Sequence, residues 1–257
     1  MTPPRNGERL PSLRTRPRPR AGTTKVHRRP GSPGGSTTVA TMPHVLSVNT
    51  GTRMDFNAAT LDHTGIAKRP VTGPVHVHAP ESGSGVEGDF VADTKNHGGE
   101  LKAVYAYARE DLDVWSAELG RDLAPGLFGE NLTTEGVDLT GAVLGERWRV
   151  GTAVLQVTGP RIPCSTFARI MERDGWVKAF TAKATPGAYF RVLEPGLVAA
   201  GDEAVLLDRP GHDVTIGLTF RAVTLEPALL PRLLDAGDHL PENLRDRVER
   251  RLTGKPA

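Results

Sequence analysis

Short β-type segments, separated by glycine and proline, constrain the fold of this chain more than any other feature. They lie between residues 45 and 208 and read VLSVN, GPVHVHA, KAVYAYA, NLTTEGV, RWRVG, AVLQVTG, GAYFRVL and AVLLD. Closely spaced strands with turn residues between them are typical of a barrel or a sandwich. We therefore expect residues 43–209 to form a mainly β domain of the α+β class, built around a β-barrel.

Helical periodicity is rare in this region and predicts two flanking helices. Residues 109–119 (REDLDVWSAEL) place Leu112, Trp115 and Leu119 on one face, with acidic residues in the first turn. This pattern is typical of an amphipathic helix whose N-terminus is stabilised by negative charge. A second helix is expected over residues 165–173, directly after the single cysteine.

Beyond residue 211 helical patterns replace strand patterns and predict a three-helix module over residues 212–252. We expect helices over residues 215–222, with Thr215 as the N-cap, over 226–236, where Pro231 forces a kink or a break, and over 241–252. The module could pack against the barrel or against a second subunit of a homodimer, and the sequence leaves both open. Acidic residues alternate with arginines in the last helix, so no unbalanced basic face favours nucleic-acid binding.

Residues 1–42 differ in composition from the rest of the chain. The first 41 residues hold nine Lys or Arg and one acidic residue, so they carry +8 while the remaining 216 carry −6, which gives the overall +2. Such a proline- and glycine-rich segment cannot bury enough surface to fold, so we expect a disordered basic extension. Met42 directly precedes the first strand-like run, which favours an upstream start-site artefact over an interacting arm. We find no signal-peptide core, and no apolar run long enough to span a membrane.

The single cysteine, Cys164, is the strongest candidate for chemistry. One cysteine cannot form an internal disulfide, so we expect a reducing, cytoplasmic compartment. Cys164 follows a strand and Pro163, and it precedes a predicted helix. The helix N-terminus and the charge of Arg161 should both lower the pKa of the thiol, which favours a nucleophile or a soft metal ligand.

Two other segments combine glycine pairs with polar side chains. Residues 95–102 (KNHGGELK) place His97 beside Gly98 and Gly99, which suits either a close backbone approach to a ligand or a surface turn. Residues 125–133 (PGLFGENLT) place Glu130 and Asn131 where they could read the edge of a heterocycle. No nucleotide-binding loop, zinc-type cluster or nucleophile elbow is present in the sequence.

Taken in order, five segments resemble the MOSC (molybdenum cofactor sulfurase C-terminal) domain family, and within it the stand-alone, YiiM-like branch. The resemblance covers residues 45–208, and the helices after Gly211 look like the module appended in that branch. The segments are His97-Gly98-Gly99, Lys102-Ala103-Val104-Tyr105, Phe128-Gly129-Glu130-Asn131-Leu132-Thr133, Arg161-Ile162-Pro163-Cys164 and Gly187-Ala188-Tyr189.

The resemblance implies a MOSC-type β-barrel that binds the molybdenum cofactor, a pterin dithiolene with a terminal phosphate. It implies that Cys164 ligates molybdenum and that His97 takes part in catalysis. It places Lys102, Phe128, Glu130, Asn131, Thr133 and Arg161 at cofactor-binding positions. More weakly, the resemblance also implies binding of pyridoxal phosphate. The branch often has a second histidine at the position of Asn96, which cannot become cationic here.

The implied activity is a two-electron reduction of N-hydroxylated compounds, such as 6-hydroxylaminopurine, to amines with release of water. One cysteine cannot hold an iron–sulfur cluster, so an external electron-transfer protein is expected as a partner. Two alternatives remain open at this point. The protein could be a sulfur carrier with a persulfide on Cys164, or a non-catalytic cofactor-binding module whose C-terminal helices dock the electron-transfer partner.

Overall fold

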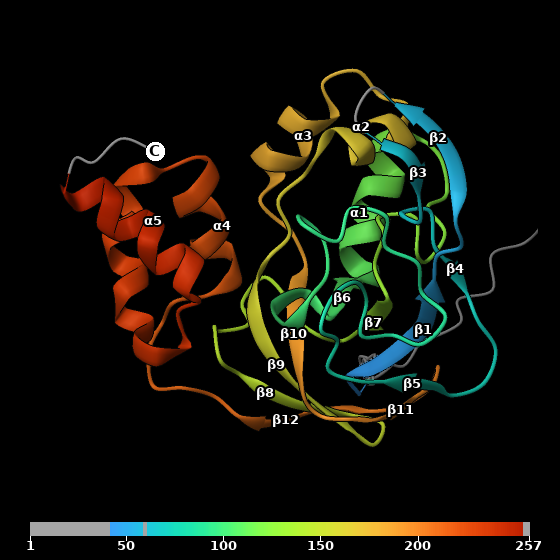
Figure 1. Cartoon of the computed structure of the whole chain (residues 1–257), viewed down its shortest axis with the longest axis horizontal. Helices are drawn as coiled ribbons and strands as arrows, with labels where there is room; N and C mark the ends of the chain where they lie inside the picture. The colour runs from blue at the N-terminus through green and yellow to red at the C-terminus, as the bar shows by residue number, and fades with distance from the viewer. Residues whose placement is uncertain (1–41, 59–60, 254–257) are drawn as a thin grey trace, which may run out of the picture. The chain divides into compact units, whose positions relative to one another are not determined.

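The computed structural model describes residues 42–58 and 61–253 (Figure 1). The extension expected to be disordered therefore lies, except for Met42, outside the described residues. The described part of the chain belongs to one compact unit. No helix within it is long and apolar enough to cross a membrane.

An eight-stranded sheet forms the centre of the fold, as the strand-like runs predict. Its neighbouring strands are antiparallel except for one parallel pair, β6 and β7. The order across the sheet is β12 (Ala204–Asp208), β8 (Arg147–Val150), β9 (Ala153–Pro160), β10 (Ala188–Glu194), β6 (Val104–Ala108), β7 (Leu132–Glu135), β1 (His44–Thr50) and β4 (Arg69–Pro70). Two small ribbons pair β5 (Val75–Val77) with β11 (Gly196–Val198) and β2 (Met54–Ala58) with β3 (Leu61–Thr64).

The sheet is open, which corrects the expectation of a closed barrel. One isolated bridge joins His44 to Glu203, and the Ala204 amide donates to the Pro43 carbonyl at 2.9 Å. β12 starts at Ala204 and pairs with β8 from there on, so no ladder between β1 and β12 is present in the described residues. Residues 43–45 and 201–204 thus join the start of β1 to the segment before β12 over a few residues, and the two strands themselves do not pair.

Both faces of the sheet are buried at β6, where all five residues are inaccessible. Because side chains alternate across a strand, Val104 and Ala106 enter one hydrophobic core and Tyr105 and Tyr107 enter another. The second core holds all three tyrosines, two of the three tryptophans and four of the seven phenylalanines. Most of the aromatic surface is thereby concentrated on the side of the sheet that carries the first three helices.

Three α-helices cover this aromatic core. Helix α1 (Arg109–Leu119) has the predicted bounds and buries Leu112 and Trp115. Helix α2 (Ser165–Met171) is two residues shorter than predicted, because Glu172 takes a left-handed conformation with φ 50°. Helix α3 (Trp176–Lys183) was not predicted, and it buries Trp176 and Phe180 one turn apart. A single 3₁₀ turn, η1 (Glu100–Lys102), precedes β6.

The C-terminal residues, where three helices were predicted, hold α4 (Ile216–Thr224), the 3₁₀ segment η2 (Pro227–His239) and α5 (Glu242–Thr253). Thr215 caps α4 as predicted, since its hydroxyl accepts a hydrogen bond from the Leu218 amide at 3.0 Å. The expected break at Pro231 is wrong. The 3₁₀ segment continues through Pro231, and the non-helical backbone lies at Gly237, with φ 53° and ψ −129°.

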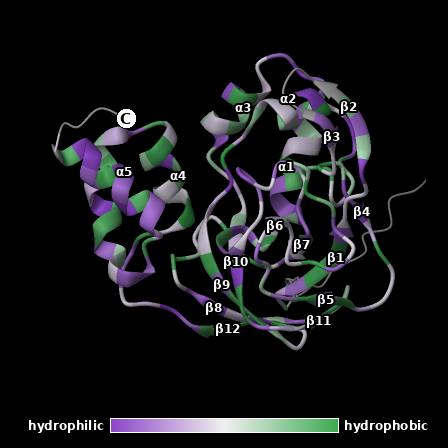
Figure 2. Cartoon of the chain, in the orientation of Figure 1, coloured by the Kyte–Doolittle hydropathy of each residue, from purple (hydrophilic) through white to green (hydrophobic). Residues whose placement is uncertain are grey.

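The module packs against the sheet of its own chain. The Leu144 amide donates to the Val214 carbonyl at 3.0 Å, and Phe220 of α4 lies 6.5 Å from the ring of Phe180. Helix α5 is mostly hydrophilic in Figure 2, and its buried residue is Val248. Arg247 of this helix donates to the Val223 carbonyl at 2.7 Å, so one of its cations serves the packing of the module.

Candidate active site

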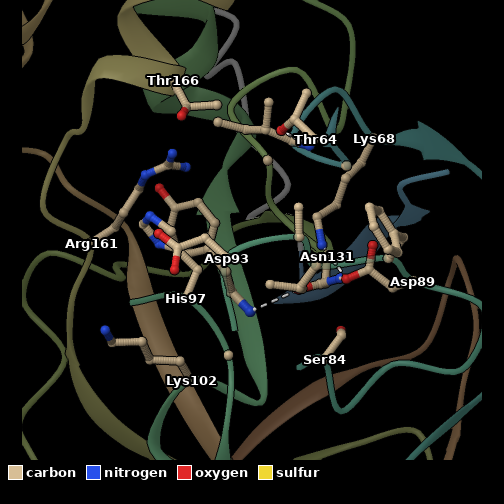
Figure 3. Close-up of a pocket in the computed structure, with 18 of the residues that line it drawn as sticks. Thr64, Lys68, Ser84, Asp89, Asp93, His97, Lys102, Asn131, Arg161 and Thr166 are labelled. Carbon is tan, nitrogen blue, oxygen red and sulfur yellow. Dashed lines mark hydrogen bonds and ion pairs between the residues drawn. The ribbon is translucent and has the colours of Figure 1, made fainter. Parts of the chain in front are cut away.

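A polar pocket lies between the N-terminus of α2 and the first residues of β6, β7 and β10. It encloses about 660 Å³, including its mouth toward solvent. Figure 3 shows two groups of side chains on opposite sides: Lys68, Asp89 and Asn131 on one, and Arg161, His97 and Asp93 on the other. Five of the predicted site residues therefore lie on one cavity: Cys164, His97, Lys102, Asn131 and Arg161.

Cys164 is the N-cap residue of α2, and its thiol is half-buried. Burial raises the pKa of the thiol, but a hydrogen bond with His97, the charge of Arg161 and the Phe167 amide outweigh it and bring the pKa down to about 6. The thiol is therefore mostly ionised at neutral pH. The expectation from Arg161 and the helix start is confirmed, whereas the contribution of His97 needed the folded chain.

Arg161 follows the end of β9 and is held by aromatic rings. Its guanidinium carbon lies 4.3 Å from the ring centre of Phe167 and 5.2 Å from that of Tyr105, and Nη1 donates to the Phe128 carbonyl. The Nε atom is buried and has no hydrogen-bond partner among the described residues. A fixed cation thus stands beside the thiol with an unused donor.

The loop that carries His97 depends on its two glycines. Gly98 has φ 101°, and a Cβ there would lie 2.3 Å from the carbonyl oxygen of Gly83. No residue with a side chain fits this approach, so Gly98 is required by the contact of the loop with the backbone of Gly83, and the predicted approach to a ligand stays a prediction. Downstream, Lys102 donates to the Asn96 carbonyl at 2.5 Å, and burial lowers the pKa of its ammonium group.

Lys68 and Asp89 form a buried ion pair that the sequence did not predict. Asp89 also accepts hydrogen bonds from the Gly51 amide at 2.7 Å and from Asn131 Nδ2 at 2.9 Å. Burial lowers the pKa of Lys68, and the charge of Asp89 opposes this change. Nothing in the spacing of these residues marks them, because Lys68 and Asp89 are 21 positions apart and each stands in a loop.

Three residues expected to bind cofactor, Phe128, Glu130 and Thr133, are not among the residues that line the pocket. Phe128 packs in the aromatic core between Tyr107 and Phe167, with ring centres 5.0 Å apart in both pairs. Glu130 is fully buried, and its Oε1 accepts from the Gly126 amide at 2.6 Å and from the Thr133 hydroxyl at 2.9 Å. Glu130 and Thr133 thus hold the loop that presents Asn131.

A second, open cavity lies outside the polar pocket, and we call it the outer vestibule. It encloses about 1450 Å³, much of it open to solvent, and its walls come from residues 92–97, Pro160 and residues 162–166, together with Lys102 and Tyr189. Six polar or aromatic residues line both cavities: Asp93, His97, Lys102, Cys164, Thr166 and Tyr189. The thiol therefore stands where the two cavities meet.

Comparison with known proteins identifies the family. The uncharacterized protein YflK of Bacillus subtilis (strain 168) is 36% identical over 174 residues, which cover 67% of this chain and 76% of YflK. Protein YiiM of Escherichia coli (strain K12) is 32% identical over 187 residues, 66% of this chain and 79% of YiiM. Residues 93–205 match the model of the MOSC domain. The chain belongs to the MOSC domain family.

Solved structures of YiiM proteins share the fold. The crystal structure of YiiM from Geobacillus stearothermophilus superposes with a TM-score of 0.66 at 29% identity, over 82% of this chain and 99% of that one. The crystal structure of YiiM from Escherichia coli superposes with a TM-score of 0.63 at 26% identity, over 83% of this chain and 94% of that one.

A protein named Reductase from Gibberella moniliformis (strain M3125 / FGSC 7600) is 32% identical over 152 residues, which cover 56% of this chain and 26% of that protein.

The MOSC domain is associated with molybdenum cofactor binding, and the polar pocket fits such a group. An ionised thiol is the ligand type that a soft, thiolate-binding metal prefers. Lys68, Lys102 and Arg161 line the same pocket and suit an anionic cofactor, and the unpartnered Nε of Arg161 is a donor that an anion would satisfy.

Proposed function

We propose that this MOSC protein holds the molybdenum cofactor through Cys164 and reduces N-hydroxylated compounds to amines. One observation carries the proposal. The ionised thiol of Cys164 lies at the boundary between the polar pocket, which Lys68, Lys102 and Arg161 line, and the outer vestibule. A cofactor in the polar pocket would meet the sulfur there, and a substrate could reach the same point from the vestibule.

Different residues of the polar pocket would bind different parts of the cofactor. Cys164 would be the metal ligand. Lys68, Lys102 and Arg161 would bind its phosphate and other anionic groups, because charge-assisted hydrogen bonds are strongest where water is excluded. When bound, the cofactor supplies a centre that exchanges two electrons. Asn131, held by Asp89, would offer an amide to the pterin edge.

The proposed reaction converts R–NH–OH, two electrons and two protons into R–NH₂ and water. The N–O bond breaks, nitrogen is reduced, and the oxygen leaves as water. The electrons come from an external electron-transfer protein, since a single cysteine cannot hold an iron–sulfur cluster. His97 lines both cavities and lowers the pKa of Cys164, so it is placed to hold a proton beside the sulfur.

The test is metal analysis combined with turnover. Protein from a host that makes the cofactor should contain about one molybdenum per chain and reduce 6-hydroxylaminopurine with reduced methyl viologen as electron donor. Cys164→Ser should lose both properties, whereas Cys164→Ser protein that still holds molybdenum and reduces substrate contradicts the proposal. Wild-type protein without metal whose Cys164 carries the mass of one extra sulfur atom would identify a sulfur carrier instead.

A further inference from the structure

Asp93 occupies a position that the proposed function does not explain. It lies on both the polar pocket and the outer vestibule, and it is the acidic residue among the described residues that line the vestibule. The ionisable side chains near it on these walls are cationic, weakly acidic or can become cationic: Lys95, His97, Lys102, Cys164 and Tyr189. A carboxylate in this position gives the vestibule one strong hydrogen-bond acceptor.

The carboxylate of Asp93 is ionised and held in place. Asn96 Nδ2 donates to its Oδ2 at 3.0 Å, and the Asn96 amide donates to its Oδ1 at 3.2 Å. The Asn96 side chain lowers the pKa of Asp93 most, and the backbone of the same turn and the charge of His97 contribute in the same direction. A carboxylate has about four lone-pair directions, so capacity for a further donor remains.

Pro160, Ile162 and Pro163 form an apolar patch on the wall of the vestibule. Ile162 leaves 44% of its surface open to solvent, and Pro163 follows it directly. Flat, weakly polar rings pack well on such a surface. The vestibule therefore combines an apolar wall with a fixed acceptor, and the thiol lies on the boundary of both.

We infer that Asp93 is a specificity-determining residue. It selects substrates in which the carbon attached to the N–OH nitrogen also carries an N–H group. Such substrates are flat amidoximes and the imino forms of N-hydroxylated aminoheterocycles, which share the unit C(=N–OH)–NH. The neighbouring N–H would donate to Asp93 while the ring lies against Ile162 and Pro163. This inference rests on the proposed function, because it assigns the substrate contact of the same site.

Reduction of an amidoxime has the same stoichiometry as reduction of an N-hydroxylamine. An amidoxime, R–C(=N–OH)–NH₂, takes up two electrons and two protons and gives the amidine R–C(=NH)–NH₂ and water. The electrons come from the external donor already named. The amidine product is a cation at neutral pH, and it should bind Asp93 more tightly than the neutral substrate does.

A pair of substrates with the same ring tests the inference. Benzamidoxime carries the neighbouring N–H group, and N-phenylhydroxylamine does not. In cofactor-loaded protein with reduced methyl viologen, Asp93→Asn should lower kcat/KM for benzamidoxime about 10- to 100-fold, mainly through KM. The value for N-phenylhydroxylamine should change less than about threefold. Equal losses for both substrates, or no loss for either, would overturn the assignment.

Product binding gives a readout that does not need turnover. Calorimetric titration with benzamidine should show a dissociation constant about 10- to 100-fold weaker for Asp93→Asn than for the unaltered protein. Asp122→Asn makes the same carboxylate-to-amide change at an exposed position outside both cavities and should leave the constant unchanged. Unaltered benzamidine binding in Asp93→Asn overturns the inference.

The two proposals can fail separately. If the unaltered protein reduces neither substrate, the proposed reductase function is wrong, and benzamidine binding alone then decides the role of Asp93. Structural damage to the loop is detected by the pKa of the Cys164 thiol, because His97 lies in the same turn as Asp93. In cofactor-free protein, a thiol pKa in Asp93→Asn close to that of the unaltered protein shows an intact loop.

Discussion

The imidazole of His97 and the thiol of Cys164 both line the polar pocket and the outer vestibule, and the imidazole lowers the pKa of the thiol at the point where the two cavities meet. The two residues are far apart in sequence and belong to different parts of the fold, one to the glycine turn before β6 and the other to the start of α2. Together with Arg161 and the Phe167 amide, His97 lowers the pKa of the thiol, and ionisation of the thiol is the property that chemistry at this site requires.

The first prediction concerns this ionisation. In cofactor-free protein the Cys164 thiol titrates with a pKa of about 6, so alkylation by iodoacetamide should slow about tenfold for each pH unit below that value. His97→Ala removes the hydrogen bond that stabilises the thiolate, and the pKa should rise toward its ordinary value. The absorbance of the thiolate at different pH values measures it. His76→Ala, at an exposed strand position, should leave the titration unchanged.

The second prediction concerns Arg161. Replacement by Ala removes the cation beside Cys164 and leaves the Phe128 carbonyl without its donor, so the thiol pKa should rise and molybdenum content should fall. Stability should fall by about 2 kcal/mol or more, because a buried acceptor loses its partner. Arg161→Lys keeps the charge but not the planar fork, and it should preserve the thiol pKa better than Ala does. Equal thiol pKa values in both variants would contradict the electrostatic explanation.

The third prediction concerns the buried pair of Lys68 and Asp89. Asp89→Asn leaves the Lys68 ammonium buried without a counter-charge, which should cost about 3–5 kcal/mol in the free energy of unfolding. Chemical denaturation measures this cost. The double variant Lys68→Met with Asp89→Asn should be less destabilised than the sum of the two single variants, because neither charge is then left alone. Additive losses would mean that the two side chains do not interact.

The fourth prediction concerns the packing of the C-terminal module. Phe220 is fully buried between α4 and the aromatic core, so Phe220→Ala should destabilise the protein by about 3–5 kcal/mol in one cooperative transition. Leu225, at the end of the same helix, is 44% exposed, and Leu225→Ala should cost about 0.5 kcal/mol or less. Separate unfolding transitions for the module and the sheet would contradict the shared core.

Local patterns explain why much of the fold could be predicted. The strands β6, β9 and β10 and the helix α1 each carry their periodicity within a few residues, and each lies where the sequence placed it. Helix α3 was missed because it is short and its stability comes from the burial of Trp176 and Phe180 among distant rings. The hairpin of β2 and β3 has no clear apolar alternation and was missed for the same kind of reason.

Sequence alone determined the identity of the reactive group and its immediate surroundings. Cys164 is the single thiol, it begins a helix, and Arg161 stands three positions before it. Long-range contacts decided the rest, because they join residues whose spacing carries no signal. The folded chain brings His97 to the sulfur, pairs Lys68 with Asp89, turns Phe128, Glu130 and Thr133 away from the pocket, and leaves the sheet open. Burial and hydrogen bonding at a distance depend on the whole packed structure, which no short segment contains.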